Sequence, residues 1–110
     1  MTNDLLARSC EPCHAGTPKL GPDEIAKLAL HLPVWSTAGD RLKRTFVFHD
    51  FAGAMQFVNK MAAVAEAEQH HPDFSVHYRD VTVTIWTHAV GGLSENDFIS
   101  AAKVDALGAA

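Results

Sequence analysis

Apolar residues recur at helical spacing in three stretches of the chain. The first stretch begins at Pro22, a residue that suits the first turn of a helix, and ends at Pro33. The second begins after Asp50, which can cap a helix, and ends shortly before Pro72, which disfavours helical backbone in the residue that precedes it. The third follows Ser94. The pattern therefore predicts three amphipathic helices.

Alternation of apolar and polar residues predicts four strands. Residues 41–49 form one strand, and residues 34–37 form a shorter one before it. Residues 74–78 and 81–86 alternate over their whole length and are separated by only two residues. The last two stretches therefore predict an antiparallel hairpin.

The apolar face of this hairpin predicts its register. With residues 79–80 as the loop, Tyr78 lies opposite Val81, and all six apolar side chains of the two strands share one face. Continued outward, the same register places His71 opposite His88, on the face away from the core. We therefore expect these two imidazoles to lie close together.

The elements follow one another as helix, two strands, helix, two strands, helix. This order predicts an α+β fold, in which a four-stranded antiparallel sheet has helices packed on one face. So small a sheet leaves edge strands open, and we expect the sheets to pair in a dimer. Residues 1–19 are expected to form a loosely ordered N-terminal arm, and residues 20–110 a single domain.

Composition and charge exclude several classes of function. The chain has 110 residues and a formal net charge of −4, which argues against a nucleic-acid partner. No apolar run approaches the length of a membrane span, so we expect no membrane partner. The first residues show neither a basic start nor a sustained apolar stretch, and we therefore expect a cytoplasmic protein.

Two cysteines and a histidine in the arm, Cys10-x-x-Cys13-His14, match the attachment pattern of c-type haem. Haem attachment normally follows export, for which the sequence gives no signal. Two alternatives are half of a zinc site and a pair of reduced thiols. The sequence alone does not decide between haem attachment, half of a zinc site and a pair of reduced thiols.

A cluster of histidines and a carboxylate carries the candidate chemistry. His70 and His71 follow the second predicted helix, His88 ends the last predicted strand, and Glu66 lies one helical turn before His70. Imidazole can both donate and accept a proton near neutral pH. We therefore predict acid–base chemistry at one end of the sheet.

The segments around this cluster resemble the pterin-4a-carbinolamine dehydratase family. The resemblance lies in Glu66-x-x-x-His70-His71-Pro72-Asp73-Phe74, in Thr87-His88, and in Gly92-Leu93-Ser94-x-x-Asp97, and it extends over roughly residues 20–107. It implies an enzyme that dehydrates 4a-hydroxytetrahydropterin to quinonoid dihydropterin during tetrahydrobiopterin recycling. It also implies a homodimer or homotetramer, functional coupling to an aromatic amino acid hydroxylase, and no metal or organic cofactor.

The resemblance also implies which residues form the site. The catalytic positions would be His70, His71 and His88, and our own hypothesis is that His70 and His88 are the main acid–base groups. Many members carry tryptophan at the position of Phe74, so the stacking wall of the pocket would be smaller here. Many carry serine or threonine at the position of Trp86, which would either reshape the pocket or pack under a partner subunit. The substrate-binding positions would be Glu66, Pro72, Phe74, Trp86, Thr87, Ala89, Val90 and Asp97.

Three other functions are compatible with the sequence. A three-histidine metal site is disfavoured because adjacent residues such as His70 and His71 point in different directions. A protein-binding role, as a dimerisation cofactor, would need no pterin turnover. The third is chemistry on another pterin, including molybdopterin metabolism.

Asp97 has a structural alternative to its substrate-binding role, as a partner of Ser94 at the start of the last helix.

Overall fold

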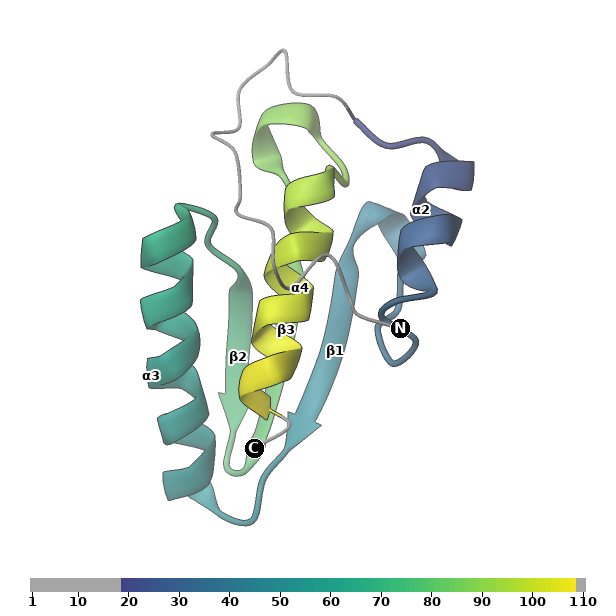
Figure 1. Ribbon diagram of the computed structural model, residues 1–110. Coiled ribbons are helices and arrows are strands. Elements are labelled where there is room, and N and C mark those ends of the chain that lie inside the picture. Colours follow the sequence, from purple (N-terminus) through teal and green to yellow (C-terminus); the bar gives the residue numbers. More distant parts are fainter. Residues whose placement is uncertain (1–18, 109–110) are drawn as a thin grey trace.

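The computed structural model describes residues 19–108 (Figure 1). Cys10, Cys13 and His14, and with them nearly all of the expected arm, lie outside these residues. The helices and strands follow one another in the order α2 (Pro22–Ala29), β1 (Leu42–Val47), α3 (Phe51–Glu68), β2 (Asp73–His77), β3 (Asp80–Ile85) and α4 (Glu95–Gly108). Two short 3₁₀ helices, η1 (Ala38–Asp40) and η2 (His88–Val90), precede β1 and follow β3.

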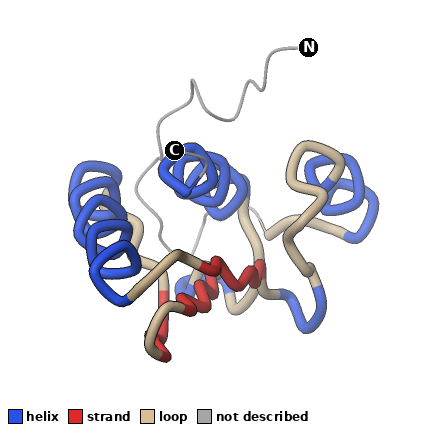
Figure 2. The backbone as a smooth tube through the Cα atoms, turned by 90° about the horizontal axis from the view of Figure 1, so that it is seen from below, coloured by secondary structure: helices blue, strands red, loops and turns tan. Residues whose placement is uncertain are grey.

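The strands form an antiparallel sheet in the order β1-β3-β2, and the three helices lie on one face of it (Figures 1 and 2). The α+β class and the one-sided packing are therefore confirmed. The prediction of a fourth strand at residues 34–37 was wrong. Of these residues, only Ser36 forms a β-bridge, with Lys43, and the described part of the chain has no strand there. A turn before it, closed by the N–H of Trp35, and the η1 turn after it leave no room for a longer ladder.

The hairpin between β2 and β3 is shifted by two residues from the expected register. Val76 lies opposite Val81 and His77 opposite Asp80, so the loop is Tyr78-Arg79 rather than residues 79–80. The cause is the central position of β3, since Asp80 also pairs with Val47 of β1 and therefore stays in the ladder. Tyr78 instead enters the turn, where it has a φ of 56° and an exposed side chain.

The core lies between the sheet and the helices. A shift of two residues keeps every side chain on its face, so β3 still buries the expected apolar residues. Phe74 of the edge strand β2 and Tyr78 of the hairpin loop are exposed, however. The buried apolar side chains include Leu32, Trp35, Leu42, Phe46, Phe57, Met61, Val81, Val83, Ile85, Leu93, Phe98 and Ile99.

One polar cluster ties α4 to β1 beneath this core. The carboxylate of Asp105 accepts hydrogen bonds from Nε1 of Trp35 at 2.8 Å and from Nη1 of Arg44 at 2.6 Å. The guanidinium of Arg44 also lies over the ring of Phe46, 4.2 Å from its centroid. The cluster is partly buried, so its hydrogen bonds contribute more than those of exposed ion pairs do.

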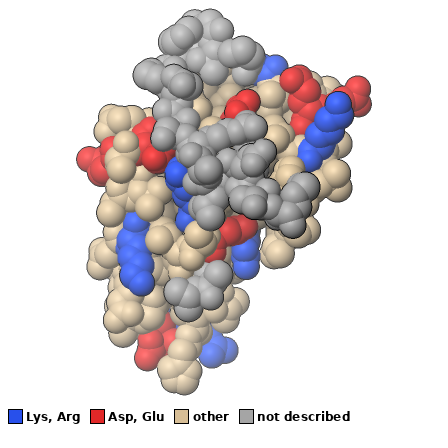
Figure 3. Space-filling view, viewed as in Figure 1, with Lys and Arg blue, Asp and Glu red and all other residues tan. Residues whose placement is uncertain are grey.

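Charges of both signs are interspersed on the face of the molecule drawn in Figure 3, and no extended basic patch is visible there. This distribution agrees with the formal net charge of −4. Among residues 19–108, none of the helices combines the length and the apolar character that a membrane crossing requires.

Candidate active site

The end of helix α3 determines where the two adjacent histidines point. Gln69 takes a left-handed backbone conformation with a φ of 54°, and its side-chain amide donates to the carbonyl of Glu66 at 2.7 Å. The N–H of His70 turns back to the carbonyl of Ala65 at 3.2 Å, which completes a C-terminal cap. Beyond this cap the two imidazoles separate: His70 is 9% exposed, whereas the side chain of His71 is 56% exposed.

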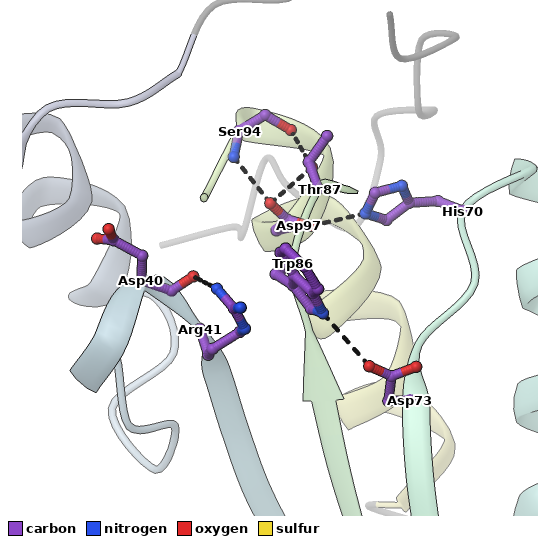
Figure 4. Close-up of polar contacts among 8 residues, drawn as sticks. All are labelled: Asp40, Arg41, His70, Asp73, Trp86, Thr87, Ser94 and Asp97. Atoms are coloured by element: carbon purple, nitrogen blue, oxygen red, sulfur yellow. Dashed lines mark hydrogen bonds and ion pairs between the residues drawn. The ribbon is translucent and has the colours of Figure 1, made fainter. Parts of the chain in front are cut away.

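His70 reaches across to helix α4. Its Nε2 lies 2.6 Å from Oδ1 of Asp97, so that the end of α3 and the start of α4 meet at this hydrogen bond (Figure 4). A carboxylate accepts hydrogen bonds and does not donate them, so the proton belongs on Nε2 of the imidazole. Asp97 thereby sets the tautomer and the orientation of the buried ring.

Asp97 is fully buried, and further donors compensate for its lost hydration. Its Oδ2 accepts from the N–H of Ser94 and from the hydroxyl of Thr87, both at 2.8 Å. Because Thr87 uses its proton in this way, the 2.8 Å contact between the two hydroxyls has Ser94 as its donor. A buried carboxylate without such partners would be strongly unfavourable, so these donors hold Asp97 in place.

His71 has a carboxylate partner of its own on the surface. Its Nε2 lies 2.5 Å from Oε2 of Glu66, whose side chain is 74% exposed. The sequence had placed Glu66 one turn from His70, but the left-handed cap turns His70 inward and brings His71 to that carboxylate. The nitrogen of His71 that faces away from Glu66 is Nδ1, which can accept a hydrogen bond from a ligand.

His88 lies just beyond the end of β3 and packs against an aromatic side chain. Its ring centroid is 3.8 Å from that of Trp86, with an angle of 42° between the planes. The guanidinium carbon of Arg41 lies 3.5 Å from the Trp86 ring, and Nε1 of the indole donates to Oδ2 of Asp73 at 3.3 Å (Figure 4). The indole is thus contacted by Arg41, which directly precedes β1, and by Asp73, the first residue of β2.

The expected pairing of His71 with His88 across the hairpin was wrong. The ladder between β2 and β3 ends at the pair Asp73–Thr84, and His88 belongs to η2 rather than to a strand. The residues that carry the candidate chemistry nevertheless gather at one end of the sheet, because the end of α3 and the end of β3 lie together there (Figure 1).

The expected substrate-binding residues divide by exposure. Thr87 and Asp97 are 2% and 0% exposed, so they support the site from inside and do not present a surface to a ligand. Phe74, by contrast, is 47% exposed. Pro72, Trp86 and Val90 are half-buried, and Ala89 is exposed.

A small recess adjoins His70 between α3 and α4. It is lined by Met61, Val64, Ala65, His70, Pro72, Ser100 and Val104. Within residues 19–108, no three side chains of His, Cys, Asp or Glu lie together in a way that could hold a metal ion. The described residues therefore give a three-histidine metal site no geometric basis.

Sequence reasoning missed Arg41 as a partner of Trp86, whereas the expected hairpin register had already placed Asp73 opposite Trp86. The contact with Arg41 joins segments that are distant in the chain, and no local motif marks it. The register of β1 does offer a signal, because the ladder ends at Leu42 opposite Ile85, and the same register continued by one residue would bring Arg41 beside Trp86. That register could not be read from the sequence without the strand order.

Comparison with known proteins agrees with the family resemblance seen in the sequence. Residues 18–107 match the family model described as pterin 4 alpha carbinolamine dehydratase. A protein from Dechloromonas aromatica that is provisionally named pterin-4-alpha-carbinolamine dehydratase is 48% identical over 104 residues, covering 94% of this chain and 93% of its own length. A protein of the same name from Nitrosomonas eutropha is 49% identical over 110 residues, with 97% of each chain covered.

Solved structures include a close neighbour of the fold. It is the crystal structure of a transcriptional coactivator/pterin dehydratase from Brucella melitensis, which superimposes with a TM-score of 0.79 at 31% sequence identity. The match covers 83% of this chain and 99% of the Brucella chain. The similarity therefore extends over the whole helix-covered sheet.

Proposed function

Since the chain belongs to the pterin-4a-carbinolamine dehydratase family, which comprises hydro-lyases, we propose that it removes water from 4a-hydroxytetrahydropterin by histidine acid–base catalysis. The observation that carries this proposal is the hydrogen bond from His70 to Asp97, which joins the His70-His71-Pro72 segment to the segment from Thr87 to Asp97. The motif that carries the family resemblance in the sequence is thus assembled around one buried carboxylate.

The reaction needs a proton donor and a proton acceptor. The hydroxyl at C4a leaves as water when its oxygen gains a proton and the C–O bond breaks, and a ring nitrogen of the pterin then loses a proton to give quinonoid dihydropterin. A positioned acid and base typically contribute about 100- to 10,000-fold each to the rate of such a step. Imidazoles can supply both roles near neutral pH.

We assign the main proton transfers to His70 and His88. His70 is supported by Asp97, keeps a small exposed surface, and lines the recess beside Pro72, so a pterin placed against that recess would meet the ring. His88 is exposed at the end of β3 and would approach the substrate from the other segment of the motif.

His71 and Glu66 form the second imidazole–carboxylate pair of the proposed site. Because Glu66 fixes the proton on Nε2 of His71, Nδ1 is left to orient the pterin ring. The exposed side chain of Phe74 and the half-buried Pro72 and Trp86 would supply apolar contacts to the ring. Ala89 and Val90 would complete the contacts from η2.

We further propose that the reaction serves tetrahydrobiopterin recycling, in which an aromatic amino acid hydroxylase supplies the substrate. Strands β1 and β2 are both edges of the sheet, and an edge can pair with the edge of a second copy. This supports a homodimer or homotetramer as the working form.

A coupled assay tests the proposal. A phenylalanine hydroxylase generates 4a-hydroxytetrahydropterin, and the appearance of quinonoid dihydropterin is followed by absorbance. We expect the wild-type protein to accelerate this step. His70→Gln and His88→Gln should each lower kcat about 100-fold or more, whereas His71→Gln should mainly raise KM.

Glutamine is chosen at position 70 because its side-chain amide can still donate to Asp97, which protects the fold. His77→Gln is the matched control, since His77 is an exposed imidazole on β2 outside the proposed site. Wild-type kcat in both His70→Gln and His88→Gln would disprove the assignment of roles. No acceleration by folded wild-type protein would reject the dehydratase activity and favour a binding role, either for protein or for another pterin.

A further inference from the structure

Trp86 is held at the edge of the proposed site by both strands that flank β3. Arg41 precedes β1 and places its guanidinium 3.5 Å from the centroid of the indole, and Asp73 opens β2 and accepts the indole N–H. Arg41 is itself anchored, because its Nη1 donates to the carbonyl of Asp40 at 3.2 Å (Figure 4). The position of the indole is therefore fixed independently of any ligand.

The imidazole of His88 depends on this indole for its position. The two ring centroids are 3.8 Å apart, and within residues 19–108 the His88 side chain makes no hydrogen bond. This distinguishes His88 from His70 and His71, each of which has a carboxylate on Nε2. An exposed imidazole without hydrogen bonds would otherwise sample several rotamers.

We propose that Trp86, clamped by Arg41 and Asp73, is a positioning residue that orients the imidazole of His88 toward the substrate. The inference rests on the proposed dehydratase function, and it gives a role to a tryptophan that the resemblance left as a departure. An aromatic contact replaces the carboxylate that orients the other two imidazoles. Small errors in the position of an acid or base cost much of its effect on the rate, which gives the contact a catalytic consequence.

The first test measures kcat and KM for Trp86 variants. Trp86→Ala should lower kcat about 10- to 100-fold, since the imidazole is no longer oriented, whereas Trp86→Phe keeps an aromatic ring but loses the N–H to Asp73 and should therefore lose less of kcat than Trp86→Ala. The double variant Trp86→Ala with His88→Gln should be no slower than His88→Gln alone, because Trp86 acts through His88. An additional loss of kcat in the double variant, or a change confined to KM, would overturn the proposal.

The second test does not need enzyme activity. In a two-dimensional ¹H–¹³C spectrum of the wild-type protein, the ring protons of His88 should be displaced by the ring current of the indole. They should move to the region of the exposed His77 in Trp86→Ala. Resonances of His88 that are unchanged by Trp86→Ala would reject the contact.

Together, the two tests distinguish a failure of the proposed positioning role of Trp86 from a failure of the proposed dehydratase function. A protein without dehydratase activity would fail the coupled assay, yet the spectrum would still show whether Trp86 orients His88. Tyr78→Ala is the control for loss of an aromatic side chain, because Tyr78 lies in the hairpin loop at the opposite end of β3. It should leave both kcat and the His88 resonances unchanged.

Discussion

Asp97 combines two tasks that the sequence presents as alternatives. As the third residue of α4 it accepts the N–H of Ser94 and so caps the helix, and with its other oxygen it holds His70. The capping role could be predicted from local spacing, since the spacing Ser94-x-x-Asp97 is that of a helix start. The contact with His70 could be predicted only through the family resemblance, because 27 residues separate the two side chains.

Asp97→Asn tests whether both tasks depend on the carboxylate. The amide nitrogen of asparagine would face an N–H or O–H donor, and buried groups without partners typically cost about 1–3 kcal/mol each. We expect the free energy of unfolding, measured in urea, to fall by about that amount and kcat to fall at least 10-fold.

Asp23→Asn is the matched control for this substitution. Asp23 is an exposed carboxylate in the first turn of α2, so only a weak interaction with the helix dipole is lost there, about 0.3–1 kcal/mol. Asp97→Asn with wild-type stability and wild-type kcat would contradict the role assigned to the buried carboxylate.

Among the elements, the starts of the helices were more predictable than the strand register or the end of α2, which lies at Ala29 rather than at Pro33. Asp50 caps α3 as expected, accepting from the N–H of Gly53 at 2.8 Å, because such a cap depends on a few consecutive residues. The hairpin register was wrong by two residues, since it depends on how β1 pairs with β3, and β1 lies far away in the chain. Tyr78 is also an unusual residue for a position with positive φ.

Tyr78→Gly should stabilise the protein. A left-handed backbone costs a residue with a side chain about 1–2 kcal/mol, and the exposed tyrosine ring contributes little packing in return. Because glycine also gains freedom in the unfolded chain, we expect a net increase of about 0.5–1 kcal/mol in the free energy of unfolding.

The same substitution at Arg79, the other loop residue, should lower the free energy of unfolding, because its φ is not positive. The two variants can be compared by thermal or urea unfolding of the full chain. A loss of stability in Tyr78→Gly equal to that in Arg79→Gly would show that the backbone at Tyr78 is not strained.

In the molecule as a whole, polar contacts between distant segments fix how α4 sits on the sheet. Asp105 of α4 joins Trp35 and Arg44, which precede and belong to β1, and it lies 61 residues from Arg44. Composition and periodicity could predict the fold class and the covered face of the sheet. They could not predict these pairs, which exist only once the helix has docked.

Asp105→Ala tests this connection. Nε1 of Trp35 and Nη1 of Arg44 would lose their acceptor, and Nε of Arg44 already lies buried without a hydrogen-bond partner among the described residues. We expect the free energy of unfolding to fall by about 2–3 kcal/mol, while kcat stays within about twofold of wild type. A large loss of kcat in a fully folded Asp105→Ala protein would mean that the docking of α4 also controls the reaction.

The hydrogen bond from the Ser94 amide to buried Asp97 makes the hydrogen-exchange rate of that amide a probe of the site. That N–H can exchange its proton with deuterated water only when its hydrogen bond to the buried Asp97 carboxylate opens. Its exchange rate therefore reports how often the start of α4 opens around the carboxylate that also holds His70, in the absence of any substrate. A single backbone amide thus measures how persistently the carboxylate that supports His70 stays in place before a ligand binds.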